Sequence, residues 1–481
     1  MGAVGGSEPC LLVGMVLGME QRDYSGLSYW LETCGDDLTP RVGLDTSIAV
    51  DVAILGAGYT GLWTAYYLAQ RDPSLTIAVL ESEIAGYGAS GRNGAWCTSG
   101  FAAGPATLTK NYGLAASRAV HLAMVDTVDE IGRVCERESI DAQFQRDGQF
   151  FAAIGKQQLP ALAHIEQEYT QLGFPEFQRR LDASEAKAFL NIDGIVGALH
   201  NEATAAIHPG RLVRGLARNV EQHRNVTIYE DTPVTSVEAG ARPVLRTARG
   251  DVRANVVVLA GEAYMAQLKA VGRQVLPLYS LIVMTEPLSD SQIADINWTH
   301  RAVAASQALT VDYLSRTQDG RILFGGRGAP YHWGSSIRPE YDLHAPTHQR
   351  LREAVVEWFP QLKGIAFSHA WGGCLGVPRD FMPVMRYDRA SGLATARGYT
   401  GEGVAATNLS GRVLADLITG TQSDLTDLPM TKHHGRSWEP EPLRFLATRL
   451  AQVGAMRIDA KANRTGKPPT GRTLTERLIS H

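Results

Sequence analysis

The sequence has few cysteines, no Cys-x-x-Cys pair and no excess of charge of one sign. Its five cysteines are Cys10, Cys34, Cys97, Cys135 and Cys374, and this wide spacing excludes a zinc ribbon and a disulfide framework. The 481-residue chain has 46 basic and 50 acidic side chains and a formal net charge of −4, which leaves no basic field to hold nucleic acid. We expect reduced thiols in a cytoplasmic protein, with no bound metal and no nucleic-acid partner.

The sequence also lacks a run of about 18 uncharged apolar residues, so neither a transmembrane helix nor a membrane partner is predicted. Residues 10–19 (CLLVGMVLGM) form an apolar stretch near the start. No basic segment precedes this stretch and no clear cleavage site follows it, which disfavours a signal peptide. We expect residues 1–18 to be a misassigned or unstructured start.

The composition that is present, with 44% hydrophobic and 20% charged residues, is ordinary for a globular protein. The length corresponds to two to four domains at roughly 100–200 residues each. Such a chain can build a core large enough to enclose a ligand.

The most informative segment begins with an apolar run at residues 52–55, which is typical of a buried parallel strand. The sequence Gly-Ala-Gly-Tyr-Thr-Gly follows at 56–61. A helical stretch over 62–70 and a second apolar run over 75–80 then lead to Glu81. This order of strand, glycine turn, helix, strand and acid predicts a dinucleotide-binding unit.

Each glycine of this turn has a mechanical role. Gly56 permits the tight turn, Gly58 lets the backbone approach a pyrophosphate, and Gly61 lets the helix pack closely on the strand. The N–H groups at the start of the helix then face the phosphates. Glu81 lies 25 positions after Gly56, where a carboxylate can accept hydrogen bonds from a ribose diol.

Two further glycine-rich segments favour FAD over NAD. Residues 86–94 (GYGASGRNG) can lay several backbone N–H groups and the Ser90 hydroxyl along an extended ligand. In residues 394–417, a strand-like start meets three glycines before a helix begins. Such a helix N-terminus suits the delocalised negative charge of a reduced flavin, whereas an NAD enzyme has no need of it.

The other segments alternate between helical and strand-like patterns. Residues 225–260 contain four short β-like runs separated by turn residues, which predicts an antiparallel meander that leads into a buried strand. We also expect an ordered N-terminal arm over 20–47, helices over 114–138, 159–172 and 443–456, and strands at 281–284 and 322–324.

These motifs together resemble the FAD-dependent superfamily of D-amino-acid oxidase and glycine oxidase. The segments that carry the resemblance are 51–94, 208–212, 256–261, 371–373 and 398–411. The GYGASGRNG loop is most similar to the gamma-glutamylputrescine oxidoreductase type. The resemblance covers roughly residues 24–425 and implies an α/β fold, in which a Rossmann-type FAD-binding domain is interleaved with a mixed-sheet substrate domain.

The resemblance implies a division of the chain as well. The FAD-binding domain would comprise residues 48–102, 196–270 and 366–425. The substrate domain would comprise residues 103–195, which are rich in helical pattern, and residues 271–365. Residues 1–47 would form the N-terminal arm and residues 426–481 a tail.

The resemblance further implies which residues bind FAD. The glycine turn would hold the pyrophosphate and Glu81 the adenosine ribose, while Val234 would contact adenine through its backbone. The GYGASGRNG loop would run toward the flavin ring, whose pyrimidine side would meet residues 401–404. The implied cofactor-binding residues are Gly56, Gly58, Tyr59, Thr60, Gly61, Glu81, Ser82, Gly88, Ala89, Ser90, Arg92, Asn93, Gly94, Val234, Ala260, Gly261, Gly398, Thr400, Gly401, Glu402, Gly403 and Val404.

Two positions depart from the family pattern. Glu402 stands where many relatives have His, and Ala405 stands where sarcosine oxidases have Lys. An ionised, inward-facing acid would disfavour negative charge on a reduced flavin, so Glu402 either points to solvent or tunes the flavin differently. Cys97 and Cys374 lie near places where some relatives attach flavin covalently, but we expect both to be ordinary buried cysteines.

Amine oxidation by a flavin needs few side chains, because the cofactor carries the hard step and the protein orients the substrate. The sequence accordingly shows no catalytic triad. Arg327 is the candidate catalytic residue, since a cation near the flavin favours the reaction with O2 or binds a substrate carboxylate. The alternative for Arg327 is a surface salt bridge.

Several other polar and aromatic residues have a structural and a functional interpretation. We expect at least one of His200 and His208 to be structural, and the run from Lys432 through His433 and His434 to Arg436 to be a solvated face. Aromatic candidates for the walls of an amine pocket, each also typical of core packing, are Trp96, Tyr279, Trp333, Trp371 and Tyr399.

The sequence therefore predicts an FAD-dependent oxidoreductase that converts the C–N bond of a primary or secondary amine to an imine, which water hydrolyses to a carbonyl product. O2 is the expected acceptor and gives H2O2, and a dehydrogenase of the same fold with another acceptor is the alternative. An NAD-dependent dehydrogenase would be colourless. An FAD protein used for assembly or sensing would be yellow, but no amine would reduce it.

Overall fold

Parallel strand pairing begins at the apolar run before the glycine turn. In the computed structural model, which describes residues 22–470, β1 (Ile48–Leu55) pairs in parallel with β2 (Ile77–Leu80) and β11 (Asp251–Leu259). Helix α2 (Tyr59–Arg71) connects β1 to β2. It begins three residues earlier than the sequence pattern indicates, directly after Gly58 at its N-cap position. The apolar stretch at residues 10–19 lies outside the described residues.

The first sheet has the strand order β17-β18-β11-β1-β2-β8, and β9 and β10 extend it from β11. The expected meander is correct for β9, β10 and β11 but wrong for residues 226–229, which form β8 and pair in parallel with β2. The reason is that helix α7 precedes β8 and makes a crossover connection, as parallel strands require. The other strand bounds in this sheet are β8 Val226–Tyr229, β9 Val234–Glu238, β10 Val244–Thr247, β17 Val384–Asp388 and β18 Leu393–Arg397.

The second sheet is mixed and has the order β16-β12-β15-β14-β13-β4-β6-β5. It includes β6 and β16, although the sequence analysis assigns the residue ranges of these two strands to the FAD-binding domain. The exact boundaries between the two domains stay a prediction. A separate pair is formed by β3 (Trp96–Thr98) and β7 (Thr204–Ala206). The bounds in the second sheet are β4 Gln149–Ile154, β5 Arg179–Leu181, β6 Ile195–Asn201, β12 Leu276–Thr285, β13 Val303–Ser306, β14 Asp312–Arg316, β15 Ile322–Arg327 and β16 Phe367–Val377.

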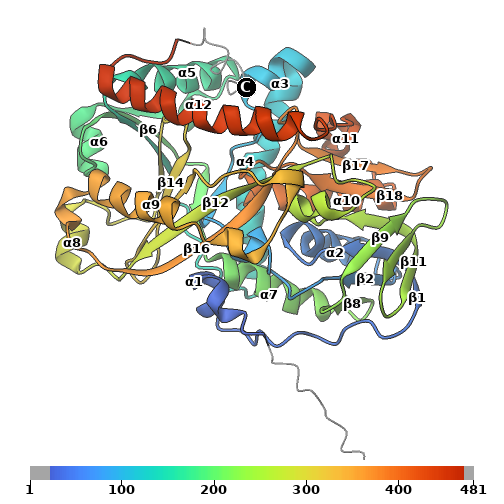
Figure 1. Cartoon of the computed structure of the whole chain (residues 1–481). Helices are drawn as coiled ribbons and strands as arrows, with labels where there is room; N and C mark the ends of the chain where they lie inside the picture. The colour runs from blue at the N-terminus through green and yellow to red at the C-terminus, as the bar shows by residue number, and fades with distance from the viewer. Residues whose placement is uncertain (1–21, 471–481) are drawn as a thin grey trace, which may run out of the picture.

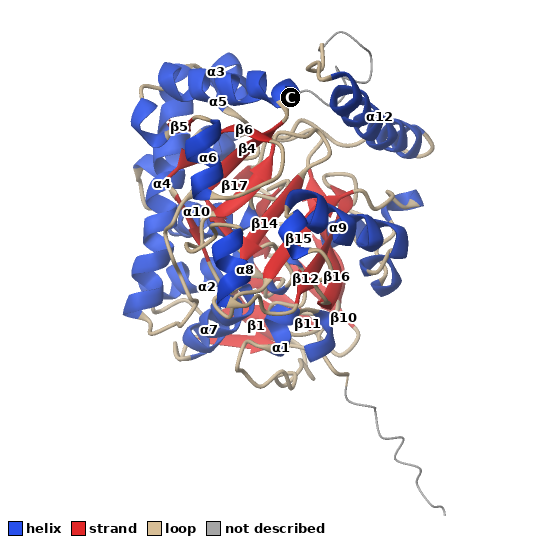
Figure 2. Cartoon of the chain, turned by 90° about the vertical axis from the view of Figure 1, so that its left-hand side faces the viewer, coloured by secondary structure: helices blue, strands red, loops and turns tan. Residues whose placement is uncertain are grey.

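Helices cover both sheets. In Figure 1 the first sheet lies on the right and the second on the left, and Figure 2 shows the strands between α4 and α7 on one side and α9 on the other. The three helices expected from the sequence are present as α4, α5 and α12. The helix bounds are α1 Tyr29–Glu32, α3 Pro105–Tyr112, α4 Leu114–Arg137, α5 Leu159–Gln171, α6 Ala183–Phe189, α7 Pro209–Glu221, α8 Asp290–Asp295, α9 Ala345–Trp358, α10 Gly403–Thr419, α11 Pro429–Lys432 and α12 Leu443–Thr465.

The described part of the N-terminal arm, residues 22–47, is ordered, as its aromatic residues indicate. The Trp30 indole N–H donates to the Asn93 carbonyl oxygen at 2.8 Å, and the Ser28 hydroxyl donates to the Gly91 carbonyl oxygen at 2.7 Å. Tyr29 and Trp30 are buried beside β12 and Trp371. The arm is therefore hydrogen-bonded to the GYGASGRNG loop and supports its conformation.

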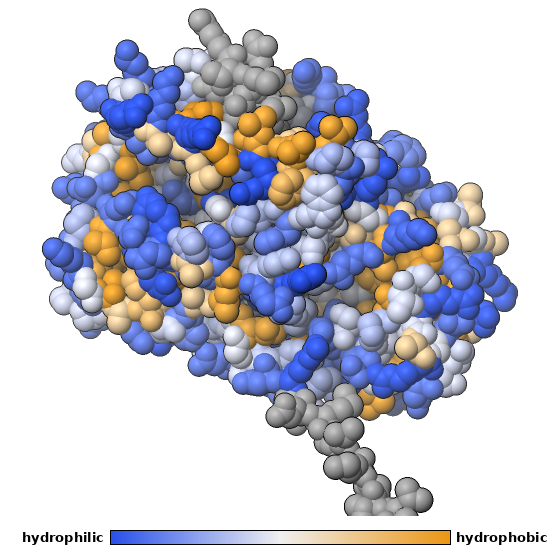
Figure 3. All heavy atoms as spheres, viewed as in Figure 1, coloured by the Kyte–Doolittle hydropathy of each residue, from blue (hydrophilic) through white to orange (hydrophobic). Residues whose placement is uncertain are grey.

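Helix α12 lies on the surface, where several of its leucines are exposed. Leu443 and Leu446 are both 60% exposed, and the space-filling view shows apolar atoms along this helix (Figure 3). Within residues 22–470, no helix is both long enough and apolar enough to cross a membrane.

Helices α2 and α10 pack in direct contact. A Cβ added to Gly411 of α10 would lie 2.7 Å from both the backbone carbonyl carbon and the Cβ of Trp63 on α2. The Asn408 side-chain amide donates to the Tyr67 hydroxyl at 2.9 Å across the same interface. This contact places the N-termini of both helices on the same side of the first sheet.

We expect Gly411→Ala to lower the free energy of unfolding by about 1–2 kcal/mol. Alanine favours an isolated helix by about 0.5–1 kcal/mol, but overpacking against Trp63 costs about 1–3 kcal/mol, so the clash decides the sign. Gly26→Ala is the matched control, because an added Cβ there meets nothing within 4 Å. Urea denaturation measures both variants, and a Gly411→Ala protein as stable as the control would contradict the close packing.

Candidate active site

A cavity of about 760 Å³ lies between the two sheets, within the usual volume range of ligand sites. The glycine turn, the GYGASGRNG loop, the end of β11, the second sheet and the loop before α10 all contribute walls. Residues singled out by the sequence that line it are Gly56, Gly58, Tyr59, Glu81, Ser82, Gly88, Ala89, Ser90, Arg92, Asn93, Gly94, Val234, Ala260, Gly261, Arg327, Gly401, Glu402, Gly403 and Val404.

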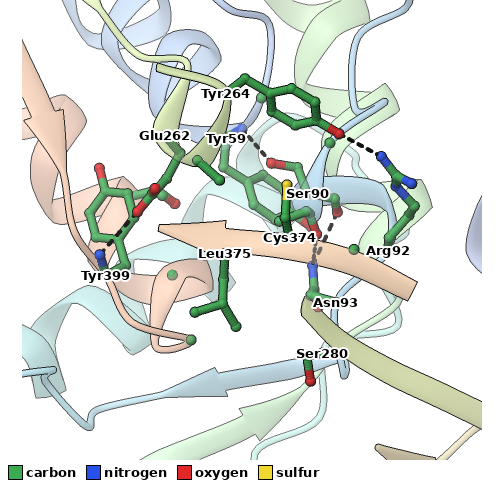
Figure 4. A pocket seen from close by; sticks show the side chains of 18 of the residues that line it. Tyr59, Ser90, Arg92, Asn93, Glu262, Tyr264, Ser280, Cys374, Leu375 and Tyr399 are labelled. Carbon is green, nitrogen blue, oxygen red and sulfur yellow. Dashed lines mark hydrogen bonds between the residues drawn. The ribbon is translucent and has the colours of Figure 1, made fainter. Parts of the chain in front are cut away.

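The glycine turn admits no side chain at its key positions. Gly56 has a φ of +102°, and a Cβ there would lie 2.9 Å from the Ala260 carbonyl oxygen. A Cβ on Gly58 would lie 3.0 Å from Ser90 Oγ, which itself accepts the Tyr59 N–H at 2.9 Å (Figure 4). The turn and the GYGASGRNG loop are thus joined where α2 begins.

Four expected residues lie behind the cavity wall rather than on it: Thr60, Gly61, Gly398 and Thr400. The Thr60 and Tyr399 hydroxyls hydrogen-bond at 3.0 Å, and a Cβ on Gly61 would clash with the Gly56 carbonyl oxygen. That these four residues contact the cofactor stays a prediction. Gly61 lets helix α2 pack closely on β1, as its place in the glycine turn predicts.

Glu81 ends β2 at the cavity wall. One of its carboxylate oxygens accepts the Ala57 N–H at 2.8 Å. Burial raises the pKa of Glu81, and the backbone N–H groups of Ala57 and Glu83 oppose that shift. The carboxyl group is thus held in place by the backbone of the glycine turn while it faces the cavity.

Arg92 lines the cavity, and its side chain is engaged by protein groups. Its guanidinium donates to Asp342 at 2.6 Å and to the Tyr264 hydroxyl at 2.8 Å (Figure 4). Although burial opposes its charge, Tyr264 and Asp342 raise the pKa of Arg92. Its Nε is buried without a partner among the described residues. Arg92 therefore connects the GYGASGRNG loop to two distant segments of the chain, at Tyr264 and Asp342.

Arg327 faces the cavity and is not in a surface salt bridge. Its Nη2 donates to the Thr400 carbonyl oxygen at 2.7 Å, and no acid among residues 22–470 lies within 4.0 Å. Burial lowers the pKa of Arg327, and the charge of Glu402 opposes this. Glu402 also lines the cavity. Burial raises the pKa of Glu402, and Arg327 opposes that shift.

The second sheet supplies cavity residues that the sequence did not single out. Tyr313 of β14 extends its ring over Gly325, where any Cβ would clash with it, and its hydroxyl hydrogen-bonds the Ser280 hydroxyl at 2.8 Å. Burial raises the pKa of Tyr313 to about 12. The adjacent glycines at 325 and 326 are the sequence signal for this close approach. Other lining residues here are Gln149, Phe151, Ser306, Gln307, Val311 and Asp312.

Asp312 adds a carboxyl group to this wall. It accepts the Ser306 N–H at 2.9 Å and the Ser306 hydroxyl at 2.8 Å. Burial raises the pKa of Asp312 to about 6, with a further contribution from Asp459. Together with Glu402, it makes this part of the cavity suitable for a cation.

Glu262, Tyr264 and Cys374 are further cavity residues (Figure 4). Glu262 follows directly after the expected residues Ala260 and Gly261, and Tyr264 comes two positions later. The nearby motif is therefore the signal that could have found them. Burial raises the pKa of the Cys374 thiol to about 12, and Cys97 is fully buried. Both cysteines are buried, as expected.

Most of the other candidate residues contact protein groups and do not line the cavity. His208 caps α7 by accepting the Arg211 N–H through Nδ1 at 3.2 Å, and His200 hydrogen-bonds the Asp147 carbonyl oxygen at 2.9 Å. Among the five aromatic candidates, Trp96 and Tyr399 line the cavity. Tyr279 and Trp371 are buried elsewhere and Trp333 is 58% exposed. In the tail run, His433 hydrogen-bonds Asp380, so the run is less solvated than expected.

Comparison with known proteins identifies the family. The chain matches the family of FAD dependent oxidoreductases over residues 51–417. It is 30% identical over 380 residues to gamma-glutamylputrescine oxidoreductase of Escherichia coli (strain K12), which covers 78% of this chain and 85% of that protein. It is 23% identical to sarcosine oxidase subunit beta of Rhodobacter capsulatus, over 78% of this chain and 86% of that one. The crystal structure of glycine oxidase from Geobacillus kaustophilus aligns with a TM-score of 0.64 at 22% identity, over 80% of this chain and 100% of that one.

The cavity fits the cofactor of this family. Glycines without room for a Cβ, a half-buried acid directly after β2 and the N-termini of α2 and α10 all border one cavity. This combination suits a dinucleotide with an anionic pyrophosphate and a flavin. The chain belongs to the family of FAD-dependent oxidoreductases and uses FAD.

Proposed function

We propose that the cavity holds FAD and that the protein oxidises a C–N bond of a primary or secondary amine. The adenosine end would lie at Glu81 and Val234, and the flavin end at residues 401–404 and Arg327. The amine would lose a hydride equivalent from carbon and a proton from nitrogen, and water would hydrolyse the resulting imine to a carbonyl compound. When bound, FAD supplies the two-electron oxidant and passes the electrons to O2, which gives H2O2.

The observation that carries this proposal is the cavity wall opposite the glycine turn. The residues that line it include two carboxyl groups, Glu402 and Asp312, and the guanidinium of Arg327. Carboxylates stabilise an ammonium group on an arriving amine, and aromatic side chains such as Trp96 and Tyr313 add an apolar surface. The similarity to gamma-glutamylputrescine oxidoreductase and to sarcosine oxidase subunit beta supports an amine substrate.

The chain's own residues would orient the amine and control its proton. Only a neutral amine releases hydride readily, so the ammonium proton must leave before oxidation. Glu402 is the carboxylate that can take this proton, because no side-chain hydrogen bond to another described residue engages it. Arg327 would stabilise negative charge that develops on the cofactor.

A dehydrogenase of the same fold is the alternative. It would accept electrons from the same amines but pass them to an acceptor other than O2. Reoxidation in air distinguishes the two, since the dehydrogenase would be reduced quickly by substrate and reoxidised slowly.

We expect the purified protein to show a flavin spectrum that bleaches under anaerobic conditions on addition of amines. The probe is a mixture of polyamines, gamma-glutamyl amines and N-methyl amino acids, which is then divided to find the active class. Admission of air should restore the oxidised spectrum and release H2O2. A flavin spectrum that no amine changes would contradict the substrate, while a colourless protein that does not take up FAD would contradict the whole proposal.

We expect Arg327→Met to slow the reaction of the dithionite-reduced enzyme with O2 about tenfold or more, because a preorganised cation next to developing negative charge is lost. Arg327→Lys keeps the charge and should react nearly as the wild type. Arg350→Met is the control, since Arg350 lies exposed on α9 and pairs with Glu357. Stopped-flow spectroscopy measures the rate, and an unchanged rate in Arg327→Met would assign Arg327 to another role.

We expect Glu402→Gln to raise the flavin midpoint potential at pH 8 by about 30 mV, which is about 1.4 kcal/mol for a two-electron couple. Removal of a negative charge from the cavity makes electron uptake by the flavin easier. Spectroelectrochemistry measures the potential, with the exposed Glu136→Gln of α4 as control. Equal potentials in wild type and Glu402→Gln would show that the carboxyl group is not an anion beside the flavin.

A further inference from the structure

The loop between β18 and α10 has a backbone conformation that needs support from outside. Gly398 and Gly401 have φ angles of +88° and +107°, and Thr400 between them has +54°. Positive φ is unfavourable for a β-branched residue such as threonine, and it persists where the surroundings hold it. This loop leads directly into the N-terminus of α10 at the cavity.

Glu262 provides much of that support. Its Oε1 accepts the Gly398 N–H at 2.9 Å and the Tyr399 N–H at 3.1 Å (Figure 4). Glu262 itself has a φ of +45°, so its own backbone is also held in an unfavourable conformation. One carboxyl group therefore joins the segment after β11 to the loop before α10.

Strand β16 is the third element that contacts Glu262 and the loop before α10. The Glu262 Oε2 is buried without a hydrogen-bond partner among the described residues, and it lies against Gly376 of β16, where any Cβ would clash with it. The Gly376 carbonyl oxygen accepts the Thr400 N–H at 3.3 Å. Arg327 holds the Thr400 carbonyl oxygen from the other side. The loop is thus fixed by Glu262, Gly376 and Arg327 together.

We propose that Glu262 is a positioning residue whose ionised carboxylate holds the loop at 398–403 against the cofactor, so that protonation of Glu262 weakens FAD binding. This inference rests on the proposed placement of FAD in the cavity, and it is independent of the substrate. A carboxylate accepts stronger hydrogen bonds than a neutral carboxyl group. The ionised form therefore holds the two loop N–H groups more firmly.

The surroundings of Glu262 bring the pKa of its carboxyl group close to neutral pH. Burial raises the pKa of Glu262 to about 7, while the Tyr399 and Gly398 N–H groups and the charge of Arg397 oppose the shift. Of the neighbouring groups, burial lowers the pKa of Arg397 to about 10 and raises the pKa of Cys374 to about 12. Burial also raises the pKa of Tyr399. None of these three groups changes charge between pH 6 and pH 8.

Glu402 lies on the same loop beside Arg327, and burial raises its pKa as well. A substitution at Glu262 is therefore needed to separate the two carboxyl groups. Glu262→Gln keeps the size and one accepting oxygen but removes the charge. It should behave at every pH as the protonated wild type does.

The experiment measures the rate at which the holoprotein releases FAD, followed by the fluorescence of free flavin, from pH 6 to pH 8. We expect release from the wild type to be about fivefold faster at pH 6 than at pH 8, the factor by which a charge-assisted hydrogen bond exceeds a neutral one. Glu262→Gln should release FAD at the fast rate at both pH values. Glu262→Ala should release it faster still, and the exposed Glu136→Gln should match the wild type.

A wild-type release rate that does not change with pH, or a Glu262→Gln protein that keeps the full pH dependence, would overturn the inference. Should the Glu262 variants fail to fold, amide hydrogen exchange at Tyr399 in the wild type decides. Corrected for the intrinsic effect of pH, this exchange should be slower at pH 8 than at pH 6, and equal protection would overturn the inference too. Neither measurement uses an amine, so both still test the role of Glu262 if the proposed substrate class is wrong.

Discussion

The close packing of α2 against α10 is the constraint on which the site depends. Gly411 brings α10 against Trp63 of α2, and the Tyr399 hydroxyl bonds Ser410 of α10 at 3.0 Å and Thr60 of α2 at 3.0 Å. The N-termini of both helices consequently open into one cavity. Each N-terminus carries a partial positive charge, so the cavity offers two sites that favour negative charge.

Around these helix ends lie two half-buried acids whose positions are fixed by backbone N–H groups. Glu81 accepts from Ala57 and Glu262 from Gly398 and Tyr399. In each case the carboxyl group joins a glycine turn to a second segment, and burial raises its pKa. Backbone donors stabilise the ionised form without adding a mobile side chain. The two turns that border the cofactor cavity are thereby held in the same way.

Local patterns in the sequence were sufficient to predict the elements around the glycine turn, and most of the candidate site residues named from these patterns line the cavity. They were not sufficient where the deciding contact is far away in the chain. Arg92 is neutralised by Asp342, 250 positions later, and β8 pairs with β2 because of the intervening α7. The second sheet presents Tyr313 and Asp312 to the cavity through its register with β13 and β15, which no short motif records.

The wall that faces the glycine turn also depends on residues beyond the range that the family match covers. Asp459 of α12 accepts the Leu309 N–H at 3.0 Å and the Thr310 N–H at 2.6 Å. These two residues lie between Gln307 and Val311, which both line the cavity. The loop is tied on its other side by the Gln158 side chain, which accepts the Gln307 N–H at 3.2 Å. Since the family match ends at residue 417, part of the cavity wall is shaped by a helix that lies outside the matched range.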